Sequence, residues 1–189
     1  MSSDATAAGV VLAAGAGTRY GMPKVFAEKG LWLQKAVAAL RDGGCGEVFV
    51  VLGAAGPDTV NLPAPARAVH AGQWAQGLSA SLRAGLEAVR AQSGAAFAVV
   101  HLVDTPDVGA GVVARVLTTA NASDSGLARA VYAGRPGHPV VLARRHWPVL
   151  LGELHGDVGA GPFLRARTDV IAVECGDLAT GADIDTPGA

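Results

Sequence analysis

Apolar runs and amphipathic stretches alternate along this chain, with glycine-rich turns between them. Three short runs are apolar at nearly every position, which is typical of strands buried on both faces of a parallel sheet. They span residues 10–14, 47–52 and 97–103. Residues 79–91 instead repeat apolar side chains at helical spacing, with Leu82, Leu86 and Val89 on one face. The pattern therefore predicts strands alternating with helices.

The weaker elements continue this alternation along the chain. Further extended segments are predicted at residues 67–70, 128–132, 139–142, 170–174 and, as a short terminal strand, 183–185. Further helices are predicted at residues 32–41, 112–120, 147–154 and 162–167. This order favours an α/β fold, a single three-layer αβα domain around a mostly parallel, Rossmann-like sheet with right-handed crossovers. The domain is expected over residues 8–187, after an N-terminal tail of residues 1–7.

Composition and net charge limit the kinds of molecule that this chain is expected to bind. Half of the 189 residues are hydrophobic and 16% are charged, so a folded core rather than disorder is expected. Fifteen basic residues nearly cancel sixteen acidic ones, which gives no general attraction to nucleic acid or to an anionic membrane. Cys45 and Cys175 form no metal-binding pattern and are expected to be buried free thiols. Because the N-terminus lacks the basic region of a signal peptide, a cytoplasmic location is expected.

Glycines follow the first predicted strand in a pattern that suits a phosphate-binding loop. Gly15, Gly17 and Gly21 leave backbone N–H groups open to ligand oxygens, and Arg19 and Lys24 supply local cations. The third glycine comes one residue too late for a dinucleotide fingerprint, and the lysine lacks the serine or threonine of a Walker A loop. A purely structural turn would explain the glycines but not the two cations. The sequence therefore predicts a polyphosphate site.

Six motifs in chain order carry a resemblance to a known family. The first, Leu12-Ala-Ala-Gly15-Ala-Gly17-Thr-Arg19-Tyr-Gly21-Met-Pro-Lys24, resembles the signature of nucleotidyltransferases with a G-T-A type fold. The others are Trp74-Ala-Gln-Gly77-Leu-Ser79-Ala-Ser81-Leu-Arg-Ala-Gly85, Leu102-Val-Asp104-Thr-Pro106, Gly134-Arg-Pro-Gly137-His138-Pro139, Gly156-Asp157-Val-Gly159-Ala and Asp183-Ile-Asp185-Thr-Pro187. Together they resemble the molybdenum cofactor cytidylyltransferases, which implies a nucleotide-diphospho-sugar transferase type of fold.

The resemblance implies an enzyme that transfers CMP from CTP to the phosphate of molybdopterin and releases pyrophosphate. Catalytic roles are implied for Lys24, Arg19 and Asp104. The nucleotide-binding residues that it implies are Leu12, Ala13, Ala14, Gly15, Gly17, Arg19, Lys24, Ser81 and Asp104. The Ala14-Gly15 pair is similar to the cytidylyl members, whereas the guanylyl relatives usually carry two glycines there.

Two carboxylates are candidates for a magnesium site. Asp104 closes a strongly apolar strand, where open α/β sheets place ligand-binding groups, and Asp185 lies on a distant late segment. Carboxylate and phosphate oxygens are the ligands that Mg²⁺ prefers. A helix cap or a turn would also explain these residues. Asp183 and Asp185 point the same way in an extended segment, so spacing does not choose between them, and the resemblance favours Asp185.

Four further residues are predicted on the side of the acceptor substrate: Ser79, His138, Gly156 and Asp157. The Gly-His-Pro motif raises His138 above an incidental structural histidine. Because a phosphate nucleophile is already ionised at neutral pH, the reaction needs no general base and depends on positioning and charge neutralisation.

The acceptor is the least defined part of this prediction. Gly161 stands where the family commonly has arginine after Gly-Ala, and Tyr20 is unusual between Arg19 and Gly21. A molybdopterin guanylyltransferase, a cytidylyltransferase for another phosphorylated small molecule, and a non-catalytic cofactor carrier or chaperone therefore stay open. A receiving molybdoenzyme or its chaperone is a further expected partner; nucleic acid and membrane are not.

Overall fold

One seven-stranded sheet forms the centre of the computed structural model, which describes residues 6–187. The spatial order is β3-β2-β1-β4-β6-β5-β7. The strands are β1 (Ala7–Ala13), β2 (Cys45–Leu52), β3 (Arg67–His70), β4 (Phe97–Leu102), β5 (Leu127–Tyr132), β6 (Arg135–Ala143) and β7 (Ile171–Glu174). β6 pairs antiparallel with β4 and β5, and the other pairings are parallel. The predicted mostly parallel α/β sheet is confirmed.

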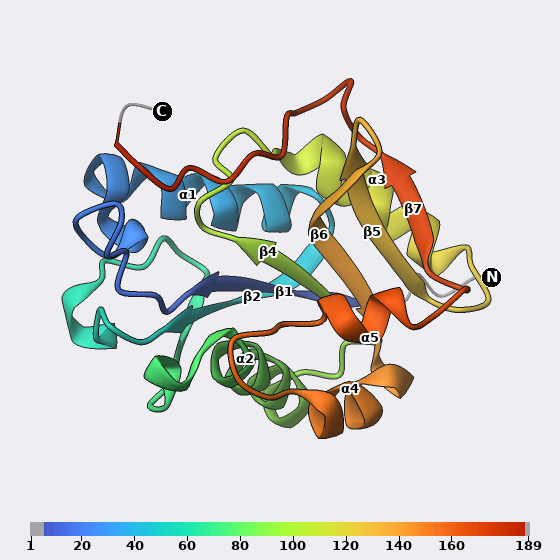
Figure 1. Ribbon diagram of the computed structural model, residues 1–189, viewed down its shortest axis with the longest axis horizontal. Coiled ribbons are helices and arrows are strands. Elements are labelled where there is room, and N and C mark those ends of the chain that lie inside the picture. Colours follow the sequence, from blue (N-terminus) through green and yellow to red (C-terminus); the bar gives the residue numbers. More distant parts are fainter. Residues whose placement is uncertain (1–5, 188–189) are drawn as a thin grey trace.

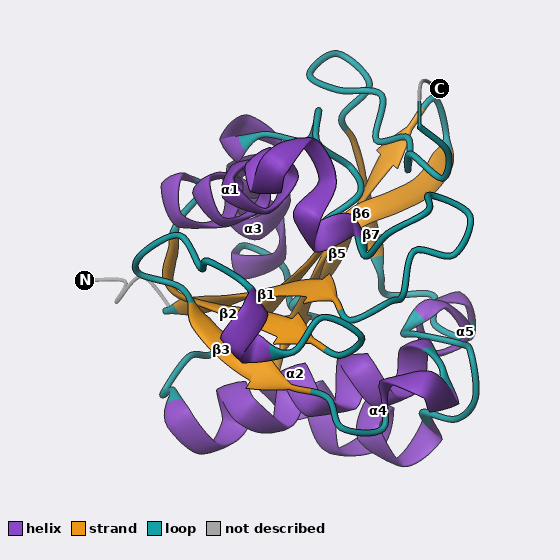
Figure 2. Ribbon diagram, turned by 90° about the vertical axis from the view of Figure 1, so that its left-hand side faces the viewer, coloured by secondary structure: helices purple, strands orange, loops and turns teal. Residues whose placement is uncertain are grey.

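Helices cover both faces of the sheet and complete three layers (Figure 1). On one face lie α1 (Ala27–Asp42) and α3 (Ala110–Asn121). On the other face lie α2 (Leu78–Gln92), α4 (Trp147–Glu153) and α5 (Gly161–Arg165), as Figure 2 shows from a second direction. Short 3-10 turns are η1 (Lys24–Phe26), η2 (Pro57–Thr59), η3 (Trp74–Gln76) and η4 (Arg144–His146). Each helix layer buries its apolar stripe against one face of the sheet.

Close packing between α2 and β1 directs the start of α2 toward the end of the strand. β1 is buried at all seven positions, as its apolar run predicts. Leu82, Leu86 and Val89 are buried on one face of α2, also as predicted. A Cβ added to Gly85 would approach Val10 Cγ1 to 2.6 Å, so glycine permits this contact. The N-terminus of α2 therefore lies near the carboxyl end of β1.

The strand order reverses beside β1. The chain leaves β1 for β2 and β3 on one side and returns to β4 on the other. In open α/β sheets such a reversal opens a crevice at the carboxyl ends of the two strands, where ligands bind. Asp104 comes two residues after β4, at this edge.

Two local features differ from the simple pattern. The predicted terminal strand at residues 183–185 is wrong: this segment is irregular, and the backbone N–H of Ile184 donates to the Asp104 carbonyl at 3.0 Å without a strand ladder. α1 contains a left-handed turn near its start, at Glu28 (φ 48°), Lys29 (φ 58°) and Gly30 (φ 85°). Regular helix therefore starts after Gly30, close to the predicted start at residue 32.

Other expectations concern the termini and the cysteines. Residues 1–5 of the expected N-terminal tail lie outside the described residues. Cys45 and Cys175 are buried free thiols, as predicted, and burial raises the pKa of Cys45 to about 12. Within residues 6–187, none of the helices combines the length and the apolar character needed to cross a membrane.

Candidate active site

The glycine loop after β1 is held in shape by two left-handed glycines. Gly17 has φ 62°, and a Cβ there would lie 1.9 Å from the Met22 carbonyl oxygen. The N–H of Gly21 donates to the Gly17 carbonyl at 2.8 Å and closes the turn. At Gly15, by contrast, a Cβ would meet no atom within 4 Å. The fold therefore requires glycine at position 17, whereas at position 15 it leaves open space beside the backbone.

A cavity of about 640 Å³ opens beside this loop, at the crevice between β1 and β4. Every residue predicted to bind the nucleotide lines it, as do both predicted metal ligands, Asp104 and Asp185. His138, Asp157 and Asp183 also line its wall. Side chains that the sequence did not single out for the nucleotide add apolar surface: Tyr20, Trp74 and Leu78. Six distant segments of the chain thus meet around one space.

Lys24 joins the two carboxylates at the floor of this site. Its Nζ lies 2.7 Å from Asp104 Oδ2 and 2.8 Å from Asp185 Oδ1. Arg19 Nη1 contacts the other oxygen of Asp185 at 2.9 Å. The side chains of Lys24 and Asp104 are 14% and 19% exposed, whereas that of Arg19 is 76% exposed. Lys24 therefore bridges the two carboxylates from a largely buried position, and Arg19 is an exposed cation beside them.

These contacts set the charge state of the site. Burial alone would lower the pKa of Lys24, but its hydrogen bonds to Asp104 and Asp185 outweigh burial and raise that pKa above its ordinary value of 10.5. The hydrogen bond from Lys24 lowers the pKa of Asp185 below its ordinary 3.8. At neutral pH the site therefore holds a charged Lys24 ammonium beside the ionised carboxylate of Asp185.

One carboxylate oxygen of Asp104 accepts no hydrogen bond from the described residues. This oxygen, Oδ1, is buried, and no hydrogen-bond donor from residues 6–187 reaches it. Among residues 6–187 no group of three His, Cys, Asp or Glu side chains could hold a metal ion, so the protein offers two carboxylates. That donor set suits a hard divalent cation that takes its remaining ligands from water and phosphate. The unpaired oxygen is the observation that fits a metal to this position.

His138 presents a neutral ring to the cavity. Burial, and then the positive charge of Arg129, lower the pKa of His138 to about 4. The hydroxyl of Tyr132 donates to the His138 carbonyl at 2.6 Å and holds the backbone of this segment. At neutral pH the imidazole is therefore uncharged and can donate or accept one hydrogen bond at each nitrogen.

Ser79 and Gly156 contact each other beside the cavity. The Ser79 hydroxyl donates to the Gly156 carbonyl at 2.6 Å, and the N–H of Leu78 donates to Asp157 Oδ1 at 3.1 Å. Gly77, at φ 113°, permits the approach, because a Cβ there would lie 2.6 Å from the Gly156 oxygen. These contacts fasten the first turn of α2. Asp157 reaches the cavity, whereas Ser79 and Gly156 lie behind it.

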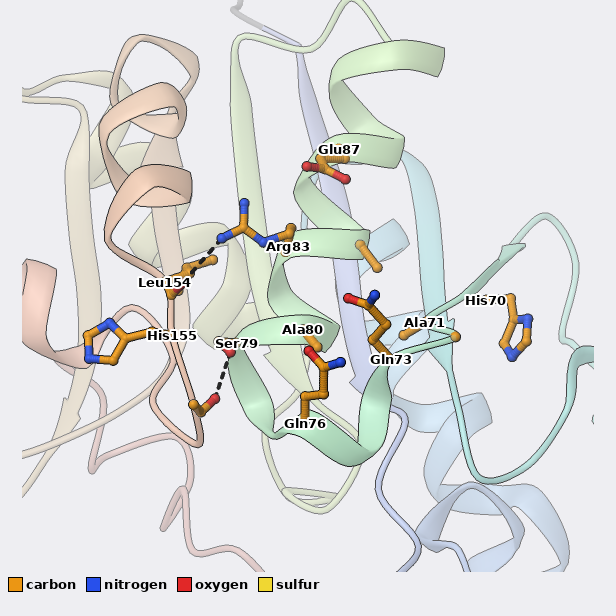
Figure 3. Close-up of a pocket in the computed structure, with 13 residues that line it drawn as sticks. His70, Ala71, Gln73, Gln76, Ser79, Ala80, Arg83, Glu87, Leu154 and His155 are labelled. Atoms are coloured by element: carbon orange, nitrogen blue, oxygen red, sulfur yellow. Dashed lines mark hydrogen bonds between the residues drawn. The ribbon is translucent and has the colours of Figure 1, made fainter.

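Ser79 and Gly156 instead border a separate groove of about 520 Å³ along α2 (Figure 3). Arg83 crosses this groove and donates to the carbonyl of Leu151 at 2.7 Å and to that of Leu154 at 3.2 Å. Gln73, Gln76 and Arg83 line it, as Figure 3 shows. The groove thus has polar walls held by contacts within the protein, and the charged cluster lies in the other cavity.

Comparison with known proteins agrees with this architecture. Nicotine blue oxidoreductase of Paenarthrobacter nicotinovorans is 34% identical over 192 residues, covering 94% of this chain and 91% of that protein. The crystal structure of Rv0371c from Mycobacterium tuberculosis H37Rv is similar with a TM-score of 0.77 at 25% identity, covering 97% of this chain and 95% of that one. The same protein has a structure in complex with manganese, at 24% identity and a TM-score of 0.67, covering 95% of this chain and 94% of that one.

The fold also matches a nucleotidyl transferase from Methanothermobacter thermautotroptrophicus, with a TM-score of 0.74 at 20% identity, covering 96% of this chain and 92% of that one. The family model for the MobA-like NTP transferase domain matches residues 9–170, which include the glycine loop, Lys24 and Asp104. The chain therefore belongs to the MobA-like NTP transferase family, and is a nucleotidyltransferase.

Proposed function

We propose that this enzyme transfers CMP from CTP to the phosphate of molybdopterin and releases pyrophosphate. The observation that carries the proposal is Lys24, bound to both Asp104 and Asp185 beside the open backbone of Gly15. Cations, paired carboxylates and an accessible glycine loop are what a triphosphate and its divalent cation require. CTP is favoured by the resemblance of Ala14-Gly15 to the cytidylyl members, and molybdopterin by the six motifs in order.

The chemistry follows from charge and position. An oxygen of the acceptor phosphate attacks the α-phosphorus of CTP in line with the bond to the β-phosphate. The new P–O bond forms as the α–β bridging bond breaks, and pyrophosphate leaves with the electron pair. The acceptor phosphate is ionised at neutral pH, so no base is needed, and the neutral His138 is available to orient the acceptor.

Different residues of the chain bind the nucleotide, neutralise its charge and would hold the metal. The backbone of residues 13–17 binds the nucleotide, and Lys24 and Arg19 neutralise the negative charge that accumulates on the phosphates. Asp104 and Asp185 would hold Mg²⁺ or another divalent cation. When bound there, the cation would supply positive charge beside the phosphates. Lys24 Nζ donates to the two carboxylates, which leaves one of its three N–H groups for a phosphate oxygen.

The similarity to nicotine blue oxidoreductase favours a second candidate. An identity of 34% over 94% of the chain makes an oxidoreductase reaction, the two-electron reduction of an acceptor, the alternative. The reductant would be a reduced nicotinamide nucleotide, whose diphosphate could occupy the same glycine loop. The neutral His138 could then donate a hydrogen bond to the acceptor. The glycine spacing, one residue longer than in a dinucleotide fingerprint, argues against this candidate.

One experiment separates these reactions. The enzyme is incubated with each NTP, Mg²⁺ and molybdopterin, pyrophosphate release is measured, and the dinucleotide is identified by mass. A parallel arm supplies a reduced nicotinamide nucleotide and a quinoid dye and follows dye absorbance. The proposal requires pyrophosphate release that depends on CTP and pterin and is lost in Lys24→Gln but kept in Lys35→Gln, an exposed lysine on α1. Dye reduction without pyrophosphate release would establish the second candidate, and tight pterin binding with neither would indicate a carrier.

A further inference from the structure

The last described segment, residues 175–187, runs along the edge of the sheet without joining it. After β7 the chain passes the ends of the central strands and continues toward α1, as the dark-red chain in Figure 1 shows. The segment contains no strand or helix, so no ladder of backbone hydrogen bonds fixes its path. It nevertheless brings Asp185 to Lys24 and Arg19 in the active site. Its few contacts with the rest of the protein therefore decide where this carboxylate lies.

Asp107 makes the first of these contacts. Its Oδ2 accepts a hydrogen bond from the N–H of Thr180 at 2.7 Å and another from the Thr180 hydroxyl at 2.6 Å. The hydroxyl oxygen of Thr180 in turn accepts from the N–H of Ala182 at 3.3 Å. Between them Gly181 turns with φ 63° against the ring of Tyr132, which a Cβ at that position would overlap. One carboxylate oxygen thus fixes the backbone and the side chain of Thr180 where the segment turns.

The second contact is to the backbone of Asp104. The N–H of Ile184 donates to the Asp104 carbonyl at 3.0 Å. Among residues 6–187, Asp107 and the Asp104 carbonyl are the hydrogen-bond partners that residues 180–184 find outside their own segment. Both partners belong to the loop between β4 and α3. The loop that carries Asp104 therefore also anchors the segment that carries Asp185.

This loop is a firm base for the anchoring. Thr105 and Val108 are 3% and 2% exposed. The Thr105 hydroxyl donates to the Leu102 carbonyl at 3.3 Å, and the N–H of Val108 donates to the Thr105 carbonyl at 3.1 Å. Asp107 lies between these buried residues, and its own side chain is exposed. Replacing that side chain therefore removes the anchor and leaves the core closed.

The ion pairs of Asp185 fix its position less firmly than the backbone contacts do. Arg19 is 76% exposed, and an exposed ion pair contributes little stability. Lys24 has a flexible four-carbon side chain, so its ammonium can follow a carboxylate that moves. The contacts at Thr180 and Ile184 instead join the segment to a loop that continues directly from β4. They lie five residues and one residue before Asp185.

We propose that Asp107 is a positioning residue for the active site. By holding Thr180 it sets the place of Asp185, and with it the separation of Asp185 and Asp104. The inference rests on the proposed function for the role of these two carboxylates. The contact requires an oxygen that accepts two hydrogen bonds, rather than a negative charge. Asparagine keeps such an oxygen and alanine does not, which separates positioning from a purely electrostatic role.

The first test needs neither metal nor substrate. Amide hydrogen exchange of the full chain is followed by NMR. In Asp107→Ala the N–H of Ile184 should exchange at least tenfold faster, although its acceptor, the Asp104 carbonyl, is unchanged. Asp107→Asn should exchange as the wild type does. So should Asp124→Ala, the matched control, which removes an exposed carboxylate before the amino end of β5. Unchanged exchange in β1 shows that each variant is folded.

The second test measures metal affinity. Mn²⁺ is titrated into the full chain saturated with a CTP analogue that has a methylene bridge between the α- and β-phosphorus, and free Mn²⁺ is followed by electron paramagnetic resonance. Loss of a group that orients a metal ligand weakens metal binding about 10- to 100-fold, and Asp107→Ala should show a loss of this size. Asp107→Asn should restore most of the affinity. Thr180→Val keeps the N–H contact and loses that of the hydroxyl, so its affinity should lie between those of the wild type and Asp107→Ala.

The outcomes separate this inference from the proposed function. A folded Asp107→Ala variant with unchanged Ile184 exchange, or with unchanged Mn²⁺ affinity, would overturn the positioning role. An asparagine variant as impaired as the alanine variant would overturn it too, because the hydrogen-bond acceptor would then be irrelevant. Failure of every NTP to bind the wild type would instead overturn the proposed function. The exchange of Ile184 in the same variants would still decide whether Asp107 holds the segment.

Discussion

Replacing Lys24 by methionine tests whether its ammonium occupies the place of a metal ion. Methionine keeps similar length and removes the charge that bridges Asp104 and Asp185. The cluster then keeps a single cation, Arg19, which contacts Asp185 and is 76% exposed. We expect the variant to fold, to lose stability, and to bind Mn²⁺ more tightly than the wild type when no nucleotide is present.

The magnitude follows from distance and exposure. Charges about 4 Å apart interact by about 4 kcal/mol at an effective dielectric constant of about 20. Exposed pairs contribute at most about 1 kcal/mol, whereas removing one partner of a fully buried pair costs about 3–5 kcal/mol. Lys24 and Asp104, at 14% and 19% exposure, lie between these limits, so a loss of about 2 kcal/mol is expected. For a chain of this size that lowers Tm by about 4–8 °C.

The same free energy opposes metal binding in the wild type. Removing the competing ammonium should therefore tighten Mn²⁺ binding about 10- to 30-fold. Calorimetric titration and the electron paramagnetic resonance of free Mn²⁺ both measure this affinity. Because the pKa of Lys24 is raised, the competing charge is fully present below pH 10.5, which covers assays at pH 7–8. Lys35→Met is the matched control. A correctly folded Lys24→Met variant with unchanged or weaker Mn²⁺ affinity would refute the reasoning.

Three further predictions follow from the described geometry. Gly15→Ala should keep stability within about 0.5 kcal/mol yet weaken CTP binding at least tenfold, whereas Gly17→Ala should lose about 2 kcal/mol or more; equal thermal shifts would contradict this contrast. Lys29→Gly relieves a left-handed φ of 58° and should stabilise by about 0.5–1 kcal/mol in urea unfolding, whereas Lys35→Gly on the same helix should destabilise by about 1 kcal/mol. His101→Leu removes a buried ring with no hydrogen-bond partner and should stabilise by about 1–2 kcal/mol at pH 7. Burial lowers the pKa of His101 to about 3, so the unfolded chain takes up the proton first and the wild type loses stability as pH falls below 6.5. The leucine variant should lose less over that range, and a steeper loss would contradict the assignment.

The apolar pattern of the sequence predicted the sheet because its central strands are buried on both faces. The start of β1 was less clear, since Ala7, Ala8 and Gly9 favour strands weakly. Close packing explains the glycine at position 9, because a Cβ there would approach Leu40 Cδ1 to 2.7 Å. Packing against α1, which no local pattern reports, therefore extends the strand toward the N-terminus.

The candidate site could be predicted where one motif contains its residues, as with Gly15 to Lys24. Pairings across long sequence separations were not predictable from spacing. Lys24 and Asp185 are 161 residues apart, and the choice of Asp185 over Asp183 came from resemblance. The structure brings Asp185 to both cations, and Asp183 lines the cavity without an ion pair among residues 6–187. The roles of these residues in catalysis stay predictions.

The surroundings of other predicted site residues depend on neighbours in space, and their roles stay predictions. Ser79 and Gly156 lie in motifs that suggested substrate contacts, but the left-handed Gly77 brings them into contact with each other.

The contact of Asp185 with Arg19 and Lys24 also bears on biosynthesis. The ribosome adds Arg19 and Lys24 early and the carboxylate that they share, Asp185, more than 160 residues later. The charge cluster is therefore incomplete for most of the synthesis of the chain. The sheet can form around β1 and β4 before Asp185 has been added. The charge cluster is therefore completed late in synthesis, when the N–H of Ile184 can donate to the Asp104 carbonyl and the neighbouring Asp185 can reach Lys24.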